Sequence, residues 1–331
     1  MKPFLSILFH LITSIRNFFY DHKILSSTSI KVPVISVGNI EMGGTGKTPV
    51  VLYLSKLLLN SNFKPGIISR GYKRSSSGQQ VVCDGEKIFF DASFVGDEPF
   101  LLAKLSKKTP IIVNKNRVSA AKFMIKNFDV NVIILDDGFQ HRKINRSIDI
   151  ALLNINTPIK SLNLFPLGRL REHFKNIYRA DILLITKQNP LSKTKNIQFA
   201  NNLYFHNKFF VSNSFRLFNP LSNIEIEKTV LVKNIFAFCG IGDPENFKQS
   251  LLSLKINPSF FKAFNDHQNY NLKIISDFEN LIFKKNIKTI ITTEKDYIKL
   301  PTNFCKTYSV LVLKMNYIFD KNFDSLILKL L

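Results

Sequence analysis

The sequence predicts an α/β fold with a doubly wound, mostly parallel sheet, a second and smaller α/β domain, and an amphipathic helix at the start. Three observations lead to this prediction. Short apolar runs alternate with helical patterns through the first two thirds of the chain, which is typical of a parallel sheet with crossover helices. A new series of strand and helix patterns begins after residue 220. At the N-terminus, apolar residues recur at helical spacing.

The composition is that of a globular protein with a basic surface. The chain has 331 residues, enough for two domains, and its 46 Lys and Arg residues against 24 Asp and Glu residues leave a net charge of +22. Such a charge suits nucleic acid, an anionic bilayer or a phosphorylated substrate. The basic residues are dispersed without an aromatic-basic stripe, so we expect no nucleic-acid partner. Three widely spaced cysteines indicate a reducing compartment and neither a zinc site nor disulfides.

Residues 1–30 are expected to form a membrane-associating amphipathic helix. Apolar residues between Phe4 and Phe19 form one stripe, and Ser6, His10 and Asn17 belong to the opposite, polar stripe. A transmembrane span needs about 20 mostly apolar residues, and this stripe is too polar for that. A helix lying in a membrane interface fits the pattern best, and a helix packed on the protein's own core is the alternative.

The segment from Val32 to Pro49 has the order that a phosphate-binding loop needs: strand, glycine-rich turn, Lys-Thr, helix. It predicts a P-loop NTPase-like domain with ATP and Mg²⁺ as cofactors, in which Lys47 contacts the β- and γ-phosphates and the Thr48 hydroxyl ligates the metal. The loop is a variant, because Glu41 stands where the full pattern has glycine. The expected nucleotide contacts are Gly43, Gly44, Thr45, Gly46, Lys47 and Thr48.

A second polar cluster follows later strand-like runs of the same domain. The apolar run Val132–Leu135 ends in Asp136 and Asp137, and two adjacent carboxylates at a strand end predict a Mg²⁺ site beside the lysine. The Arg70–Arg74 loop carries three cations in five residues, which could bind an anion or simply be solvated. The candidate substrate contacts are Arg70, Arg74, Arg117 and Asn39.

A kinase also needs a group that orients and deprotonates the acceptor hydroxyl. Asp97 follows a glycine at a helix start, where it could act as base or only cap the helix. His267 lies beside Asp266 in a loop of the second domain. Either residue could be the base, or the two could pair.

The remaining patterns set the predicted domain limits. Residues 31–220 form the kinase domain and residues 221–331 the smaller domain, with the possibility that the C-terminal segment packs back on the first. Residues 81–90 read as a hairpin, and the Asn-rich segment 191–220 reads as a boundary or linker. No obligate protein partner is evident.

Taken together and in order, the motifs SVGNIEMGGTGKTP, SRGYKR, GDEP, LDDGFQH, GRLRE, FCGIGDPENF, FNDHQNY and TTEKDYIKL resemble the tetraacyldisaccharide 4'-kinase family along most of the chain. The resemblance implies transfer of the ATP γ-phosphate to the 4'-hydroxyl of tetraacyldisaccharide 1-phosphate, which gives lipid IVA in lipid A synthesis. It also implies a peripheral location at the cytoplasmic face of the inner membrane in a Gram-negative envelope, with the N-terminal helix as the membrane contact.

The same resemblance assigns roles to residues of this chain. Asp97 of GDEP is the implied base, paired with His267. Asp136, Asp137 and Gln140 of DDGFQH fall at the metal and phosphates, and Glu172 of GRLRE faces the same region.

Two rival functions stay open from the sequence. A P-loop GTPase or metal-insertion chaperone would carry Asn/Thr-Lys-x-Asp, and Thr186-Lys187-Gln188-Asn189 departs from it by ending in an amide. The other rival is a membrane-tethered ATP switch that positions nucleic acid, whose DNA binding would depend steeply on salt.

Overall fold

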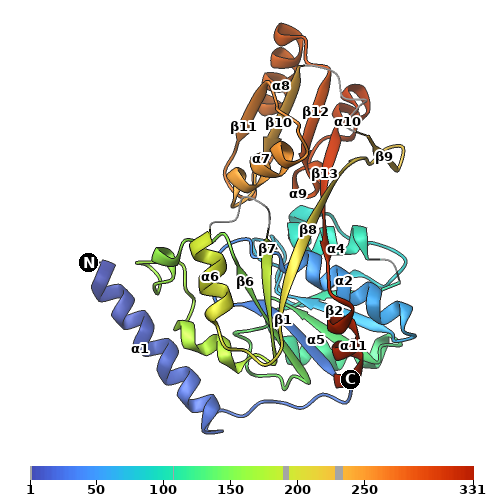
Figure 1. Cartoon of the computed structure of the whole chain (residues 1–331). Coiled ribbons are helices and arrows are strands. Elements are labelled where there is room, and N and C mark those ends of the chain that lie inside the picture. The colour runs from blue at the N-terminus through green and yellow to red at the C-terminus, as the bar shows by residue number, and fades with distance from the viewer. Residues whose placement is uncertain (1, 107, 189–193, 228–233) are drawn as a thin grey trace. The chain divides into compact units, whose positions relative to one another are not determined.

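The computed structural model describes residues 2–106, 108–188, 194–227 and 234–331 (Figure 1). The chain divides into two compact units, Met1–Asn213 with Tyr317–Leu331, and Ser214–Asn316. The sequence set the domain limit at residues 220 and 221 and allowed the C-terminal segment to pack back on the first domain. In the structure residues 214–220 belong to the second unit and residues 317–331 to the first.

The first unit is built on a mostly parallel sheet, as predicted. Its strand order is β8-β7-β6-β1-β5-β2-β4-β3, and β3 pairs antiparallel with β4. The strands are β1 (Val34–Asn39), β2 (Pro65–Ser69), β3 (Gln80–Cys83), β4 (Ile111–Val113), β5 (Val132–Asp136), β6 (Ile148–Asn154), β7 (Ile182–Gln188) and β8 (Lys208–Asn219).

The register of the central strands positions the functional site. Strand β1 lies between β5 and β6, and Val37 pairs with Asp136 on one side and Ile150 on the other. Parallel strands end at the same edge of a sheet, so the loops after β1 and β5 leave it side by side. The central strands are apolar and buried on both faces, which is why they read as continuous Val, Ile and Leu runs.

Helices connect the strands of this unit. Helix α5 covers Ile133 and Leu135 of β5 with Ala120 and Met124, and α2 contacts β1 and β5. The helices are α1 (Lys2–Asp21), α2 (Lys47–Asn60), α3 (Ala92–Val95), α4 (Asp97–Leu105), α5 (Arg117–Asn127), α6 (Thr194–Asn202) and α11 (Lys321–Leu330).

Two local predictions were right only in part. The expected boundary or linker at 191–220 contains the limit between the two units, after Asn213, but it is no linker, since it contains α6 and the 12-residue strand β8, apart from residues 191–193, which lie outside the described residues. Strand β8 shows no alternation because most of its residues are half-buried, so no period could reveal it. The predicted hairpin at 81–90 is present in a short form, in which the end of β3 pairs antiparallel through one bridge between Cys83 and Ile88 and Phe89 N donates to Val82 O at 3.0 Å.

The second unit has a parallel sheet with the order β11-β10-β12-β13. Its core is aromatic, and Phe236, Phe238 and Phe278 are almost fully buried. The elements of this unit are β9 (Ile224–Ile226), β10 (Ile235–Cys239), α7 (Pro244–Ser253), β11 (Phe260–Ala263), α8 (Leu272–Lys285), β12 (Thr289–Thr293), α9 (Glu294–Tyr297), α10 (Thr302–Tyr308) and β13 (Leu311–Ile318), whose last residues join the first unit.

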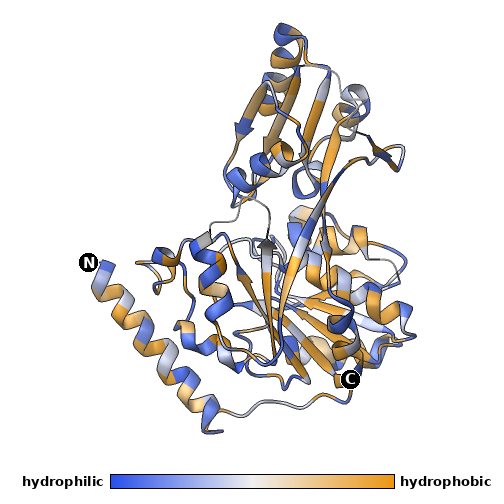
Figure 2. Cartoon of the chain, in the orientation of Figure 1, coloured by the Kyte–Doolittle hydropathy of each residue, from blue (hydrophilic) through white to orange (hydrophobic). Residues whose placement is uncertain are grey.

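Helix α1 turns its polar face inward. Ser6 and Asn17 are its buried residues and Phe9 is half-buried, whereas the other large apolar side chains are exposed. Figure 2 shows hydrophobic and hydrophilic residues alternating along this helix. Within the described residues, no helix is both long and apolar enough to cross a bilayer. The exposed apolar residues are Phe4, Leu5, Ile7, Leu8, Leu11, Ile12, Ile15, Phe18 and Phe19.

Candidate functional site

The glycine-rich loop joins β1 to α2, and its conformation needs two of its glycines. Gly43 has φ +108° and Gly46, the N-cap of α2, has φ +91°, both in the region that favours glycine. A Cβ on Gly43 would lie 2.1 Å from the Arg169 guanidinium, and one on Gly46 would lie 1.8 Å from the Tyr317 hydroxyl. Both side chains therefore pack directly on the loop backbone.

Two polar side chains, Asn39 and Thr186, fix the position of Thr45 in the glycine-rich loop. Asn39 Nδ2 donates to Thr45 Oγ1 at 2.8 Å, and Thr186 Oγ1 donates to the Thr45 carbonyl at 2.7 Å. The GRLRE segment pairs with the loop as well, since Met42 N donates to Arg169 O at 2.7 Å and Arg169 Nε donates back to Met42 O at 3.1 Å.

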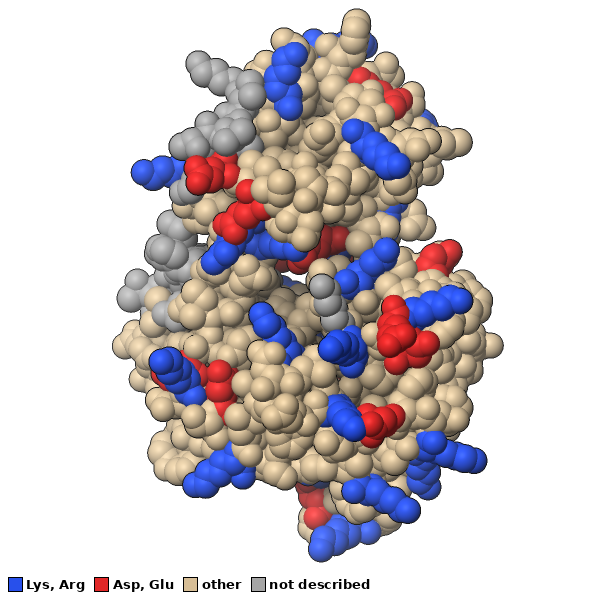
Figure 3. Space-filling model, turned by 90° about the vertical axis from the view of Figure 1, so that its right-hand side faces the viewer, with Lys and Arg blue, Asp and Glu red and all other residues tan. Residues whose placement is uncertain are grey.

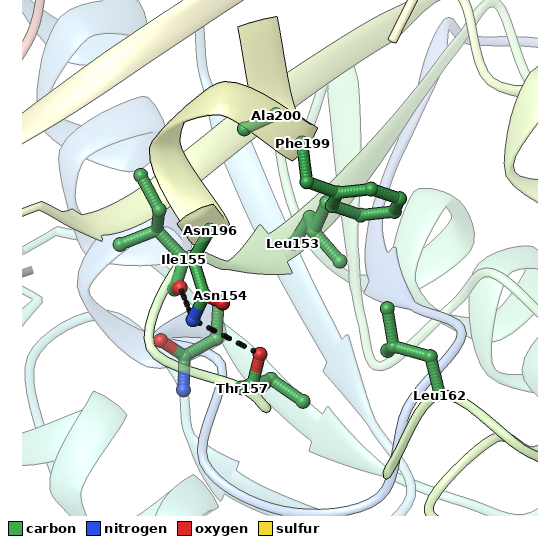
Figure 4. A pocket seen from close by; sticks show the side chains of 8 residues that line it. All are labelled: Leu153, Asn154, Ile155, Thr157, Leu162, Asn196, Phe199 and Ala200. Atoms are coloured by element: carbon green, nitrogen blue, oxygen red, sulfur yellow. Dashed lines mark hydrogen bonds between the residues drawn. The ribbon is translucent and has the colours of Figure 1, made fainter. Parts of the chain in front are cut away.

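Glu41, the residue that departs from the usual loop pattern, is an anchor. It is 1% exposed and accepts hydrogen bonds from Asn154 N at 3.1 Å and Thr157 Oγ1 at 2.7 Å. Asn196 secures the same turn by donating to Ile155 O at 2.7 Å, beside a cavity of about 10 Å³ (Figure 4). That volume holds about one water molecule, so this cavity is too small for a substrate.

Lys47 points at the end of β5, where Asp136 and Asp137 form the acid pair of this site. Its Nζ lies 3.3 Å from Asp137 Oδ1, and Arg171 donates to both oxygens of the same carboxylate at 2.9 Å. Burial opposes ionisation of Asp137, but the charges of Lys47 and Arg171 outweigh it and hold its pKa well below the ordinary value. Asp137 is therefore a permanent anion between two cations.

Asp136 is in a different state. It is 1% exposed, its Oδ2 accepts from Ser69 Oγ at 2.8 Å, and its Oδ1 is buried without a hydrogen-bond partner in the described part of the chain. Burial, with the negative charges of Glu98 and Asp137, raises the pKa of Asp136 to about 6. A buried carboxylate oxygen with no partner fits a cation.

These groups fit Mg²⁺ in the way that nucleotide-dependent enzymes use it. Among the described residues, no three His, Cys, Asp or Glu side chains come together as a metal cage. Mg²⁺ commonly takes only one or two carboxylates and fills its shell with water and phosphate oxygens. Asp136 and Thr48, which is 8% exposed in the first turn of α2, offer such a partial set.

The predicted metal residues Gln140 and Glu172 are bonded to each other. Gln140 Nε2 donates to Glu172 Oε1 at 2.9 Å and to the Asn39 carbonyl at 2.7 Å. Glu172 is 1% exposed, and Oε2 accepts from Arg179 NH1 at 2.7 Å and from Asn176 Nδ2 at 3.0 Å. In this structure Glu172 therefore joins the two loops beside the acid pair.

The candidate substrate cations differ in their surroundings. Arg117 is 4% exposed, and burial lowers its pKa against the favourable charges of Asp137 and Asp136. Arg70 is exposed and near enough to act electrostatically on Arg117. Arg74 is tied to the backbone by bonds to Gly78 O and to Val113 O, the latter at 3.5 Å.

A basic hollow of about 420 Å³ opens beside this site. Four cationic residues and no acid line it. Burial and the charges of Arg117, Arg146, Lys143 and Arg16 lower the pKa of His141 in its wall to about 4. Such a hollow suits a phosphorylated ligand. Its lining residues are Arg16, Tyr20, Lys115, Asn116, Gln140, His141, Arg142 and Lys143.

Asp97 is the first residue of α4, and Gly96 precedes it with φ +99°. The Asp97 side chain is half-buried and follows the N-cap position, which Gly96 occupies. Its neighbour Glu98 is near enough to raise the pKa of Asp136, so the start of α4 lies near the end of β5.

His267 belongs to the second unit, where a buried carboxylate orders its loop. Its Nε2 lies 3.8 Å from Asp266 Oδ2, and its backbone N donates to Gly240 O at 3.2 Å. Asp296 is 0% exposed and accepts from Tyr270 Oη at 2.8 Å and Gly240 N at 3.0 Å. Asp296 thus holds the glycine turn and the DHxxY loop together.

The family model described as Tetraacyldisaccharide-1-P 4'-kinase matches residues 2–331. The chain belongs to the tetraacyldisaccharide 4'-kinase family. The resemblance seen in the motifs is therefore confirmed, and it extends over both units.

Relatives in this family match the chain along nearly all of its length. It is 37% identical over 329 residues to the Tetraacyldisaccharide 4'-kinase of Desulfotalea psychrophila, covering 98% of this chain and 94% of the relative. The protein of that name from Chlorobium chlorochromatii is 36% identical over 306 residues, with coverages of 90% and 82%. The crystal structure of "apo" form LpxK from Aquifex aeolicus in complex with ATP has a TM-score of 0.81 and 32% identity, covering 99% of this chain and 97% of that one.

Several contacts of this family member could not be read from its sequence. Tyr317 meets Gly46 across 271 positions of the chain, and no local pattern marks it. Glu41 did carry a signal, because an acid inside an apolar and glycine-rich stretch must be exposed or bonded.

Proposed function

We propose that this chain transfers the γ-phosphate of ATP to the 4'-hydroxyl of a tetraacyldisaccharide 1-phosphate, giving lipid IVA and ADP. One observation carries the proposal: Lys47 and the acid pair meet at the end of β1 and β5, in a chain of this kinase family. Phosphoryl transfer needs mainly positioning and electrostatic stabilisation, and these groups provide both.

The donor half of the proposed site is the P-loop of residues 43–48 with the acid pair. Lys47 would bind the phosphates, and the loop amides would surround them. Bound Mg²⁺ supplies positive charge to the transferring phosphate, and Thr48 and Asp136 would hold it, with Asp137, Gln140 and Glu172 around them.

The acceptor half of the proposed site uses Asp97 as the base, with His267 as its partner. Asp97 would accept the proton of the 4'-hydroxyl as the oxygen attacks the γ-phosphorus, and His267 would orient the carboxylate. The basic hollow beside α1 supports a phosphorylated acceptor, and Arg70, Arg74, Arg117 and Asn39 are proposed to contact it.

The proposed setting is the cytoplasmic face of the inner membrane. We expect residues 1–30 to associate with lipid as an amphipathic helix, which the outward apolar stripe of α1 supports. Residues 31–220 would then act as the P-loop kinase domain and the following unit as the smaller domain.

An assay with labelled ATP and the disaccharide 1-phosphate in mixed micelles tests this function directly. We expect label to enter the lipid with ATP and much less with GTP. Efficient use of GTP without lipid labelling would favour the GTPase or metal-insertion chaperone instead. In that rival's motif Thr186 is a buried anchor of the P-loop, and Asn189 lies outside the described residues.

The nucleic-acid switch makes a different prediction. On the face shown in Figure 3, Lys and Arg side chains are scattered among Asp and Glu side chains. A switch that positions DNA would bind it with a steep salt dependence, and we expect no such binding.

A further inference from the structure

The inward face of α1 bonds to both loops that frame the acid pair. Asn17 is 5% exposed, and its Nδ2 donates to Glu172 Oε2 at 2.9 Å. Arg16 NH2 donates to the Gln140 carbonyl at 3.1 Å. Arg142 reaches back from its NH1 to the Asn17 carbonyl at 3.1 Å. The helix is thus attached at one place to the LDDGFQH loop and to the GRLRE loop.

These bonds continue to the phosphate-binding loop. Glu172 accepts from Gln140, and the same Gln140 amide donates to the carbonyl of Asn39. Asn39 in turn donates to Thr45. Two side chains, Glu172 and Gln140, therefore separate the helix from the backbone that leads into the P-loop.

The fully buried contacts of α1 are polar. Ser6 and Asn17 are its buried residues, Phe9 is half-buried and packs edge-on against Phe165, and most of its large apolar residues are exposed. A buried amide costs free energy unless it is hydrogen-bonded, and Asn17 Nδ2 offsets part of that cost through the charged acceptor Glu172, whereas Asn17 Oδ1 is buried with no partner among the described residues. An anchor that served only to hold lipid would not need a buried polar contact beside the acid pair.

We propose that α1 is a positioning element of the phosphate site, in which Asn17 and Arg16 hold Glu172 and Gln140 in place. This inference rests on the proposed kinase function. Because coupling between sites is reciprocal, lipid contact that orders α1 also orders the loops around the acid pair, and ordered loops hold α1.

The test replaces Asn17 by leucine, which keeps the branching and the number of side-chain heavy atoms and removes the hydrogen-bonding groups. In mixed micelles we expect kcat to fall about 10- to 100-fold, as for other small displacements of a reacting centre, with the KM for lipid nearly unchanged. Hydrogen–deuterium exchange of the nucleotide-free protein should rise at residues 138–142 and 168–172. Asn17→Gln, which keeps an amide donor, should lose less kcat and show a smaller rise in exchange than Asn17→Leu.

Ser6→Ala is the matched control, since Ser6 is also buried on α1 but donates to Leu164 O at 3.2 Å and to neither Gln140 nor Glu172. It should leave kcat and the exchange of residues 138–142 unchanged. Arg16→Met provides an independent variant if Asn17→Leu does not fold.

The proposal is overturned if Asn17→Leu and Arg16→Met keep wild-type kcat and exchange. Exchange that rises evenly through the first unit would also overturn it, because Asn17 would then contribute only to stability. Absence of lipid phosphorylation by the wild type would contradict the proposed function instead, and the exchange comparison would still report on positioning.

Discussion

Asp136 and Asp137 at the end of β5 are neighbours in the sequence, but their surroundings differ and shift their pKa values in opposite directions. Asp137 is ion-paired with Lys47 and Arg171, whereas Asp136 is buried beside Ser69 with one free oxygen. The raised pKa of Asp136 means that its charge destabilises the fold while no cation is bound. The position of Asp136 therefore lowers the stability of the metal-free fold, which is a common loss at binding sites.

Asp136→Asn should therefore stabilise the metal-free protein while abolishing most activity. The pKa of Asp136 rises from 3.8 to about 6, and a shift of that size corresponds to about 1–3 kcal/mol at neutral pH. Because the folded pKa is raised, the wild-type penalty is full above about pH 6 and disappears as pH falls below the unfolded value near 4. Urea unfolding from pH 4 to 8 in chelator measures this difference. If the two proteins differed in unfolding free energy by the same amount at every pH, the raised pKa of Asp136 would be contradicted.

Asp97→Asn should separate catalysis from nucleotide binding. Loss of a general base commonly costs about 10²- to 10⁴-fold in rate, and we expect kcat to fall by that amount. ATP affinity, measured by calorimetry, should stay close to that of the wild type because the P-loop is untouched. Asp91→Asn is a control for α-helix capping, since Asp91 caps α3 by accepting from Phe94 N. Wild-type turnover of Asp97→Asn would remove Asp97 as the base.

At the scale of elements, the glycine-rich loop between β1 and α2 is held in place by hydrogen bonds from neighbouring segments. The 40–42 segment pairs with the GRLRE segment through an isolated bridge between Glu41 and Leu170, and the Glu41 side chain accepts from Asn154 N at the end of β6. A loop lacking one glycine of the usual pattern thus keeps its shape through tertiary bonds, and GRLRE acts as a support of that loop.

Helix α1 makes a prediction at the same scale. Replacing the exposed Ile7 and Leu11 by serine should lower partitioning into liposomes about tenfold each, because each side chain contributes about 1.5–3 kcal/mol when buried in an apolar medium. Turnover in detergent micelles and ATP affinity should change little. The double variant of Lys2 and Lys23 to Ser controls for charge. Liposome binding equal to that of the wild type would refute the membrane role of this face.

At the scale of the whole molecule, the first unit is made from both ends of the chain. Strand β13 returns to it at Tyr317, and α11 follows. In this unit Tyr53 Oη donates to Asp324 Oδ1 at 2.6 Å, and Phe323 and Ile327 are fully buried. The C-terminal segment is therefore part of the kinase unit's core.

Removing residues 321–331 should destabilise the first unit selectively. Loss of two buried apolar side chains costs about 4 kcal/mol or more. Hydrogen exchange should rise at β1, α2 and β8 and stay unchanged at β10 and β12 of the second unit. If hydrogen exchange rose equally in both units, the two units would unfold together and the predicted selective destabilisation of the first unit would be wrong.

Local chemistry explains why much of the site was predictable. The P-loop residues and the acids after β5 follow strand and helix periods, and each lies within a few positions of the element that carries it. Parallel strands that end at one edge then bring those separate motifs together, so Lys47 and Asp137 meet as the fold class requires.

Other contacts have no local pattern to read. Strand β8 was read as part of a boundary or linker because its half-buried residues have no period, and only its place at the limit between the units agrees with that reading. The contact of Tyr317 with Gly46 depends on the return of the chain to the first unit. Likewise the motifs show that Asp136 and Asp137 are neighbours, but packing alone makes one an ion-paired anion and leaves the other buried with a raised pKa. The periodicity of apolar residues predicts the secondary structure of a segment and the face of it that is buried. The ionisation state and partners of a side chain depend on desolvation and on charges brought in from distant segments, and these exist only once the chain has folded.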